Sequence, residues 1–140
     1  MNHIYKKSFF CLVLFCTVTV QAQLAVSVSP PKITGQKAVV TLAMKNGLAE
    51  KVESARAVCF LLDEQGKMVG QATKWVIGGT KDRPALEPKG KTTFNFVITS
   101  SQPFTTTNLT AKVIFSRVIL ANDRPANVAK DVDITGTTQH

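Results

Sequence analysis

Residues 57–67 read Ala-Val-Cys-Phe-Leu-Leu-Asp-Glu-Gln-Gly-Lys, an apolar run followed by a short polar turn that contains glycine. A short apolar run bounded by turn residues is typical of a buried β-strand. The segment Asp63 to Gly66 predicts a tight hairpin turn, because glycine adopts a positive φ without steric cost. We therefore expect a strand over 55–62 that returns through this turn as a strand over 67–77.

The same pattern extends outward along the chain. Turn signals such as Pro30-Pro31 and Asn46-Gly47 separate further β-type runs. Such runs at roughly 8–12-residue spacing are typical of all-β sandwiches. The sequence predicts an all-β, seven-stranded sandwich of the immunoglobulin or fibronectin type, with Greek-key connections. The other five strands are expected over 24–29, 38–45, 91–99, 109–119 and 127–135, and the residues expected to face the core include Leu24, Val26, Val28, Val40, Leu42, Met44, Phe94, Phe96 and Ile98.

The N-terminus has the layout of a secretory signal peptide. Lys6 and Lys7 precede an apolar run over 9–20, and Ala22 ends a small-residue cleavage motif. The run is shorter than the ~20 residues that span a bilayer. We expect a signal-peptide helix in 1–22, a sandwich in 23–135 and a flexible tail in 136–140. The protein would be periplasmic or secreted, with no membrane span after cleavage; an uncleaved anchor is the alternative.

The composition removes most of the usual catalytic groups. The two histidines are His3, which would leave with the signal peptide, and His140 at the end of the chain. Ser-His-Asp and Cys-His sites would lack their base, and histidine-type zinc sites would lack ligands. We therefore expect a non-catalytic binding or structural module without cofactor or metal. An enzyme that uses carboxylates alone is the competing class.

One cysteine, Cys59, would remain after cleavage, because Cys11 and Cys16 lie in the signal peptide. Its apolar surroundings predict a buried and inert thiol. An intermolecular disulfide is the alternative.

The chain is basic, and this bears on its partners. It has 17 basic and 9 acidic residues, so removal of Lys6 and Lys7 leaves 15 against 9, a net charge of +6. Outside the cytoplasm this charge favours an acidic protein or another anionic ligand. The basic residues are scattered, which argues against nucleic acid. Solubility alone is the other interpretation of the charge.

The segment from Cys59 to Gly66 resembles the signature of the FxLYD family of exported bacterial domains, in which a Phe-x-Leu-Tyr-Asp strand ends in a hairpin. Leu61, Asp63 and Gly66 match this signature, whereas Cys59 and Leu62 stand where the family has Phe and Tyr. Residues 86–90 are similar to the family's Leu-x-Pro-Gly turn, with the glycine one residue late. The resemblance covers roughly residues 38–99 and implies a small extracytoplasmic sandwich, with no catalytic residue to carry over.

One candidate binding surface is an end of the sandwich. Asp-Arg-Pro occurs at 82–84 and again at 123–125. In a Greek-key order both copies would lie at the same end, where arginine can form bidentate contacts with carboxylate or sulfate. The residues proposed for this site are Arg83, Arg124, Lys81 and Lys51, with Lys45 nearby. Ordinary turn chemistry is the alternative interpretation.

A second candidate is a sheet face. The strand over 55–62 is apolar on both sides, so one side is left over when the other enters the core. Val58, Phe60 and Leu62, joined by Ile114, would then form a surface for a partner or for weak self-association. An envelope chaperone that acts through this face or through an edge strand is the alternative function. The other interpretations are that loops cover the strand, or that its two sides are exchanged.

Trp75 lies near the end of the strand predicted over 67–77, on the parity of Thr73 and Ile77. Buried aromatic side chains dominate the cores of such sandwiches, so we expect Trp75 in the core rather than stacked on a ligand.

Overall fold

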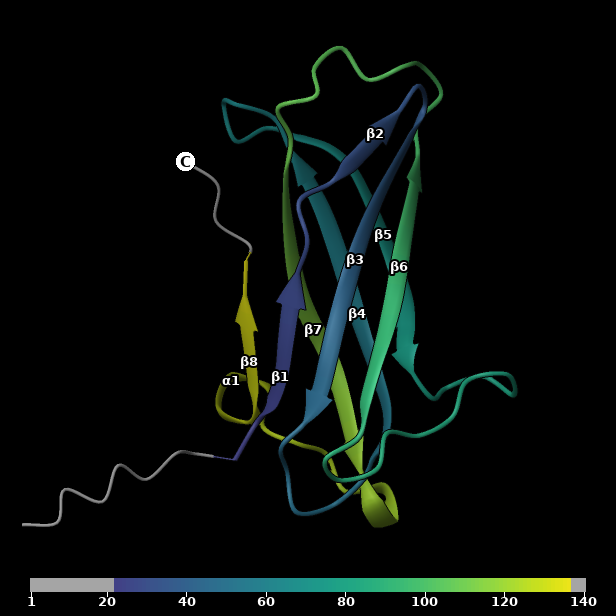
Figure 1. Ribbon diagram of the computed structural model, residues 1–140, viewed down its shortest axis with the longest axis vertical. Helices are drawn as coiled ribbons and strands as arrows, with labels where there is room; N and C mark the ends of the chain where they lie inside the picture. Colours follow the sequence, from purple (N-terminus) through teal and green to yellow (C-terminus); the bar gives the residue numbers. More distant parts are fainter. Residues whose placement is uncertain (1–21, 137–140) are drawn as a thin grey trace, which may run out of the picture.

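The computed structural model describes residues 22–136, which form two β-sheets packed face to face (Figure 1). The all-β sandwich predicted from the sequence is therefore confirmed. The signal-peptide helix was predicted over 1–22 and the tail over 136–140; residues 1–21 and 137–140 of these lie outside the described residues.

The larger sheet has five strands, β1 (Leu24–Val28), β2 (Lys32–Thr34), β3 (Lys37–Asn46), β6 (Lys91–Thr99) and β8 (Val132–Thr135). Strand β3 is central. On one side it pairs with β6 over its length, from Lys37↔Thr99 to Lys45↔Lys91. On its other side it pairs with β1 and then β2, which are two short strands in place of one long one because Pro30-Pro31 interrupts them.

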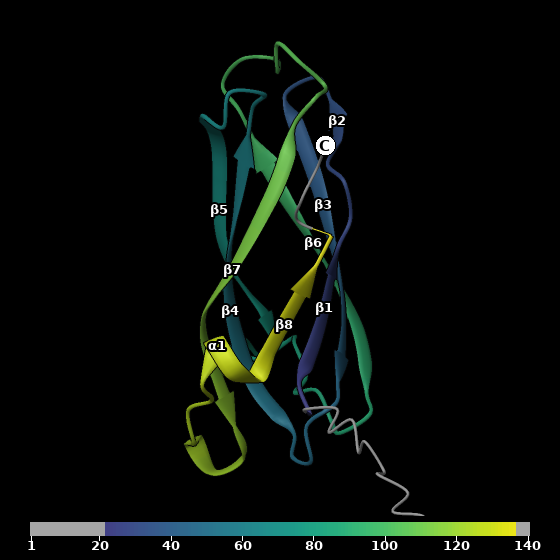
Figure 2. The same ribbon diagram turned by 90° about the vertical axis from the view of Figure 1, so that its left-hand side faces the viewer.

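The smaller sheet has three strands in the order β5 (Met68–Ile77), β4 (Val52–Leu62) and β7 (Thr110–Leu120). All its pairings are antiparallel. A 3-10 helix, η1 (Ala121–Asp123), and one turn of α-helix, α1 (Val128–Asp131), lead from β7 to β8 (Figure 2). Strand β4 begins three residues before the start predicted from the sequence, and it is central in this sheet.

The prediction of a strand over 127–135 is wrong for the first half of that range. Residues 128–131 form α1, because the Asn127 side chain accepts a hydrogen bond from the Lys130 amide and the Asp131 carboxylate accepts one from the Asn127 amide, at 2.9 Å. These reciprocal bonds satisfy amides that a helix start leaves free. Strand β8 therefore begins only at Val132.

Strand β8 lies in the larger sheet, where it runs parallel to β1 from Leu24↔Val132 to Ser27↔Thr135. In immunoglobulin sandwiches the last strand instead joins the sheet that holds the sixth predicted strand, here β7. Figure 2 shows β8 crossing beside β7 on the opposite layer. The smaller sheet therefore ends at β7.

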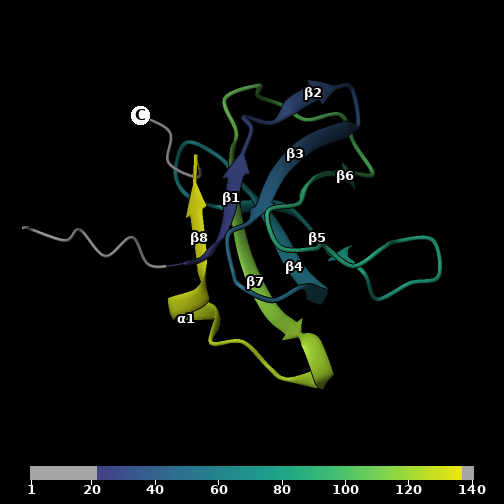
Figure 3. The same cartoon turned by 60° about the horizontal axis from the view of Figure 1, so that its bottom comes forward.

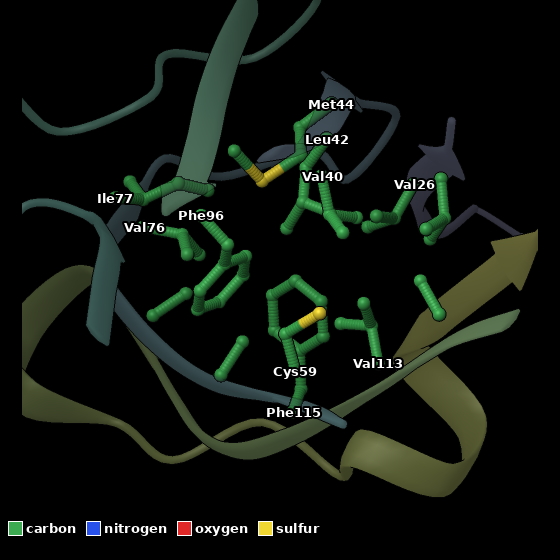
Figure 4. Close-up of a cluster of buried hydrophobic side chains, with 14 of the residues drawn as sticks. Val26, Val40, Leu42, Met44, Cys59, Val76, Ile77, Phe96, Val113 and Phe115 are labelled. Carbon is green, nitrogen blue, oxygen red and sulfur yellow. The ribbon is translucent and has the colours of Figure 1, made fainter. Parts of the chain in front are cut away.

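The core lies between the sheets and follows the predicted alternation. Ala57, Cys59 and Leu61 of β4 are fully buried and belong to the same core cluster as Leu42 and Phe96 of the other sheet. Figure 4 shows Cys59 among the side chains of this core. The core residues predicted on β1, β3 and β6 are all buried except Phe94, which is half-buried on β6 and packs edge-to-face against Phe96. The alternating apolar pattern thus assigned the inner side of each of these strands correctly.

The hairpin between β4 and β5 forms as predicted. The Asp63 carboxylate accepts hydrogen bonds from the amides of Gln65 and Lys67, at 3.0 and 2.8 Å. Gly66 has a φ of 77°, which a side chain would oppose.

Asn46 is a fully buried polar residue at the end of β3. Its side-chain amide donates to the carbonyls of Glu50 and Leu86, each at 3.0 Å, and its side-chain oxygen accepts from the Leu48 amide. Its backbone carbonyl also accepts a 2.7 Å hydrogen bond from Lys89, whose φ is 64°. Asn46 therefore ties two loops to one end of the sandwich.

We predict that Asn46→Ala lowers the free energy of unfolding by about 2–4 kcal/mol, because it leaves buried backbone groups without partners. The matched control is Asn95→Ala, which removes one exposed hydrogen bond to Thr41 and should change stability by less than about 1 kcal/mol. Urea denaturation followed by Trp75 fluorescence measures both. Equal losses in the two variants would contradict the role assigned to Asn46.

Candidate interaction surface

The outer side of the smaller sheet carries a continuous set of apolar side chains. Val58, Phe60 and Leu62 line the central strand β4, while Ile114 of β7 lies opposite Val58 and Met68 of β5 lies opposite Leu62. Directly opposed residues in an antiparallel pair point to the same side of the sheet. Ile114 is 46% and Met68 50% exposed, and the β4 residues are half-buried between their neighbours. We call these five residues the apolar face.

The four residues predicted for this surface therefore lie together on the outer side of the smaller sheet. Met68 was missed by the sequence analysis. A register shift between Leu61 and Leu62 sets Met68 opposite Leu62 and leaves Val69 as an extra residue, itself 37% exposed. A strict alternation read from sequence cannot locate such a bulge.

The prediction that Trp75 lies in the core is wrong. Trp75 is half-buried on the outer side, opposite Arg56, whereas Val76 and Ile77 both enter the core. A second register shift, between Ala55 and Arg56, exchanges the two sides of β5 at this point. The Arg56 guanidinium lies 5.8 Å from the centroid of the Trp75 ring, within cation–π range.

Cations border the apolar face on one flank. Arg56 is directly opposite Arg117 of β7, and Lys112 of β7 is directly opposite Phe60. On the β5 flank the corresponding residues are the neutral Gln71 and Thr73. Across these paired positions, from Arg56 to Leu62, the described strands place no carboxylate on the outer side. The face is therefore apolar along β4 and positively charged along β7.

The other predicted site lies at the end of the sandwich where β3, β5 and β7 finish. Its loops, 47–51, 78–90 and 121–127, do share one end (Figure 3). The Arg83 guanidinium lies 4.6 Å from the Phe94 ring centroid, whereas Arg124 forms an ion pair with Glu50. The two arginines therefore have separate partners and form no common pocket among the described residues.

The two lysines predicted for the same site share no contact partner among the described residues. Lys51 is 3.8 Å from Glu53, and Lys81 is exposed in the 78–90 loop. Lys45, expected nearby, instead lies on the outer side of the larger sheet opposite Lys91.

Lys45 and Lys91 border a shallow hollow of about 660 Å³ on the larger sheet. Small side chains form its floor, among them Ala25, Ser27 and Ala43, and Asp133 of β8 lies opposite Ala25. This hollow could not be predicted from the sequence, because its floor combines residues from four strands. None of these side chains forms an ion pair within the part of the chain that the structure describes.

Burial makes the thiol of Cys59 chemically inert. The side chain is fully buried, and desolvation of its charged form raises the pKa of the thiol to about 12. The thiolate, which is the nucleophile, is therefore scarce at neutral pH. Residues 22–136 also contain no cluster of three or more His, Cys, Asp or Glu suited to a metal ion. None of the helices within this range has the length and apolar character needed to cross a membrane.

Comparison with known proteins supports the class, a two-layer β-sandwich. No family model matches the chain, and no curated protein matches its sequence. Among solved structures it is similar to one from Bordetella pertussis provisionally assigned as an ApaA protein, with a TM-score of 0.54 and 17% identity over 75% of this chain and 85% of that chain. At this identity the likeness supports the fold alone.

A glycosyl hydrolase family 2 member from Bacteroides cellulosilyticus is matched with a TM-score of 0.39 and 18% identity. The match covers 73% of this chain and 14% of that chain. The low score carries no argument about this protein.

We predict that Cys59 resists alkylation by iodoacetamide at pH 8 in the native protein and reacts fully in guanidinium. Its folded pKa is raised, so the unfolded state loses the thiol proton first and stability falls as pH rises from about 9 towards 12. The loss should approach ~1.4 kcal/mol per pH unit and be absent in Cys59→Ala. Peptide mapping and denaturation at several pH values measure both effects. Rapid native alkylation would contradict the burial argument.

Proposed function

We propose that this protein is an exported, non-catalytic binding module that holds an acidic protein partner on its apolar face. The observation that carries the proposal is the contiguous outer set of Val58, Phe60, Leu62, Met68 and Ile114, bordered by Lys112, Arg117 and Arg56. Apolar contact supplies affinity to a protein interface, and a cationic border selects an acidic partner and speeds its approach.

The positive charge beside the apolar face bears on whether the partner is another protein or a second copy of this chain. In a symmetric dimer formed through this face, the cations of each copy would approach those of the other. Like charges brought together at an interface cost free energy. The same surface therefore fits an acidic partner better than self-association.

Export is supported by the sequence of residues 1–22, and the chain is compatible with cleavage after Ala22. Strand β1 begins at Leu24, and the Gln23 side chain donates a hydrogen bond to the Lys130 carbonyl at 2.9 Å, so the described sandwich starts directly after the predicted cleavage point. We place the protein in the periplasm or outside the cell on this basis.

Membership of the FxLYD family is part of the same proposal. The turn at residues 87–90 supports it, because Lys89 occupies the position where the family pattern has glycine and has a φ of 64°. That conformation normally favours glycine. The Asp63–Gly66 hairpin gives further support, since the aspartate and glycine of the pattern both have defined roles in the turn.

We predict that the protein recovered from the cells that produce it begins at Gln23, with residues 1–22 removed. Mass spectrometry of the intact protein and N-terminal sequencing measure this. Recovery of a chain that retains its apolar leader in the membrane fraction would overturn cleavage and favour an uncleaved anchor.

A second prediction concerns the apolar face. A photo-crosslinking amino acid at position 114 should yield an adduct with an acidic protein of the envelope, and Phe60→Asp should reduce that adduct about tenfold or more. The aspartate places a charge at the centre of the buried contact, where a single residue commonly contributes over 1.4 kcal/mol.

The matched control is the same crosslinker at position 97. Val97 is 49% exposed, like Ile114, but lies on the outer side of the larger sheet. Equal adducts from positions 97 and 114, or an Ile114 adduct unaffected by Phe60→Asp, would overturn the proposed function. A homodimeric adduct as the main product would favour self-association instead.

A further inference from the structure

We infer that the free edge of β7, over Thr110–Phe115, binds an extended acidic segment of the partner as a fourth strand of the smaller sheet. This inference rests on the proposed function and adds the form of the partner: a β-strand that continues the apolar face.

No strand within residues 22–136 is hydrogen-bonded to this edge of β7. One edge of β7 pairs with β4 from Leu62↔Thr110 onward. On the other edge, the described backbone hydrogen bonds involve Val118 and Leu120, which contact Ala126 and Arg124. Because β8 joins the larger sheet, Thr110–Phe115 keeps an unpaired row of backbone groups within residues 22–136. Such a row is a template for another strand.

The other sheet edges are less suitable for an added strand. Strand β5 has two register shifts, and Lys74 lies opposite the inward-facing Ala57, an arrangement that discourages edge pairing. Strand β6 lies against β5, so closely that a Cβ on Gly70 would meet Ile98 at 2.9 Å. Strand β8 has only four residues. By contrast β7 is regular from Thr110 to Phe115, before its irregularity at Ser116.

The charge of β7 also favours this edge. The cations of the outer side are concentrated on β7, where Lys112 and Arg117 flank Ile114 and all three are exposed. A strand paired with Thr110–Phe115 would set its residues directly beside Lys112 and Ile114, and Arg117 would lie just beyond the paired stretch. An acidic residue next to Lys112 would pair with its charge, and an apolar residue next to Ile114 would cover its side chain. The favoured partner segment therefore alternates acidic and apolar residues on its outer side.

Two β7 strands from separate copies fit this edge less well. Pairing across a twofold axis would bring the Lys112 and Arg117 side chains of both copies onto one short ribbon. Cross-strand like charges destabilise pairing, whereas opposite charges each contribute about 0.2–1 kcal/mol. The edge is thus better matched to an acidic strand than to itself.

The test uses a nine-residue peptide of alternating valine and threonine with two glutamates on the side that meets Lys112 and Arg117. Hydrogen exchange of the intact protein is followed by NMR with and without this peptide. We expect slower exchange of amides within Ala111–Phe115, because edge pairing sequesters backbone groups that face docking leaves free. Lys112→Glu should weaken binding about fivefold, and a peptide with lysines for the glutamates should restore it.

Lys74→Glu on β5 is the matched control, since Lys74 is exposed on the other edge strand and its reversal should not change binding. Unchanged β7 exchange at saturating peptide would overturn the inference, as would equal binding of the lysine peptide to the unaltered protein. If a higher protein concentration without peptide slowed exchange of the β7 amides, the inference would be overturned in favour of pairing between β7 strands of two copies. An Ile114 adduct with a partner that leaves β7 exchange unaltered would leave the proposed function standing and remove only the edge inference.

Discussion

The structure depends on a constraint placed on strand β4, which is apolar on both sides but can enter the core with only one. Ala57, Cys59 and Leu61 enter it fully and contact side chains from the larger sheet. Val58, Phe60 and Leu62 are then left on the outer side of a sheet that is only three strands wide. Burial of the first set contributes to the folding free energy, and exposure of the second set is a consequence of the same sequence.

The alternation of apolar residues was sufficient to place most strands and their inner sides, because a period of two decides which residues share a face. It failed where the register changes. One extra residue near Val76 moves Trp75 outside, and another at Val69 brings Met68 onto the apolar face. Bulges depend on how two strands meet, so a pattern along one strand does not contain them.

Other features could not be predicted from the sequence, because they depend on contacts between distant segments. The buried Asn46 amide joins the carbonyls of Glu50 and Leu86, which are 4 and 40 residues away. The sequence marks Asn46 only as a turn residue before glycine. Likewise, both arginines of the Asp-Arg-Pro repeats occur at one end of the fold as Greek-key order requires, but local partners separate them: a ring for Arg83 and a carboxylate for Arg124.

The position of β8 connects the fold to the proposed interaction. Its pairing with β1 covers one edge of the larger sheet and leaves the smaller sheet to end at β7. Half-buried Val132 and Ile134 still pack against the core from β8, so the interior beside β7 is closed although no strand is hydrogen-bonded there. Val113 and Phe115 consequently remain buried on an edge strand, at 4% and 3% exposure. The edge is therefore ordered and open at the same time, which lowers the entropic cost of adding a strand. Lys112 and Arg117 lie on that edge strand. Apolar and electrostatic contributions would therefore act together on one partner segment.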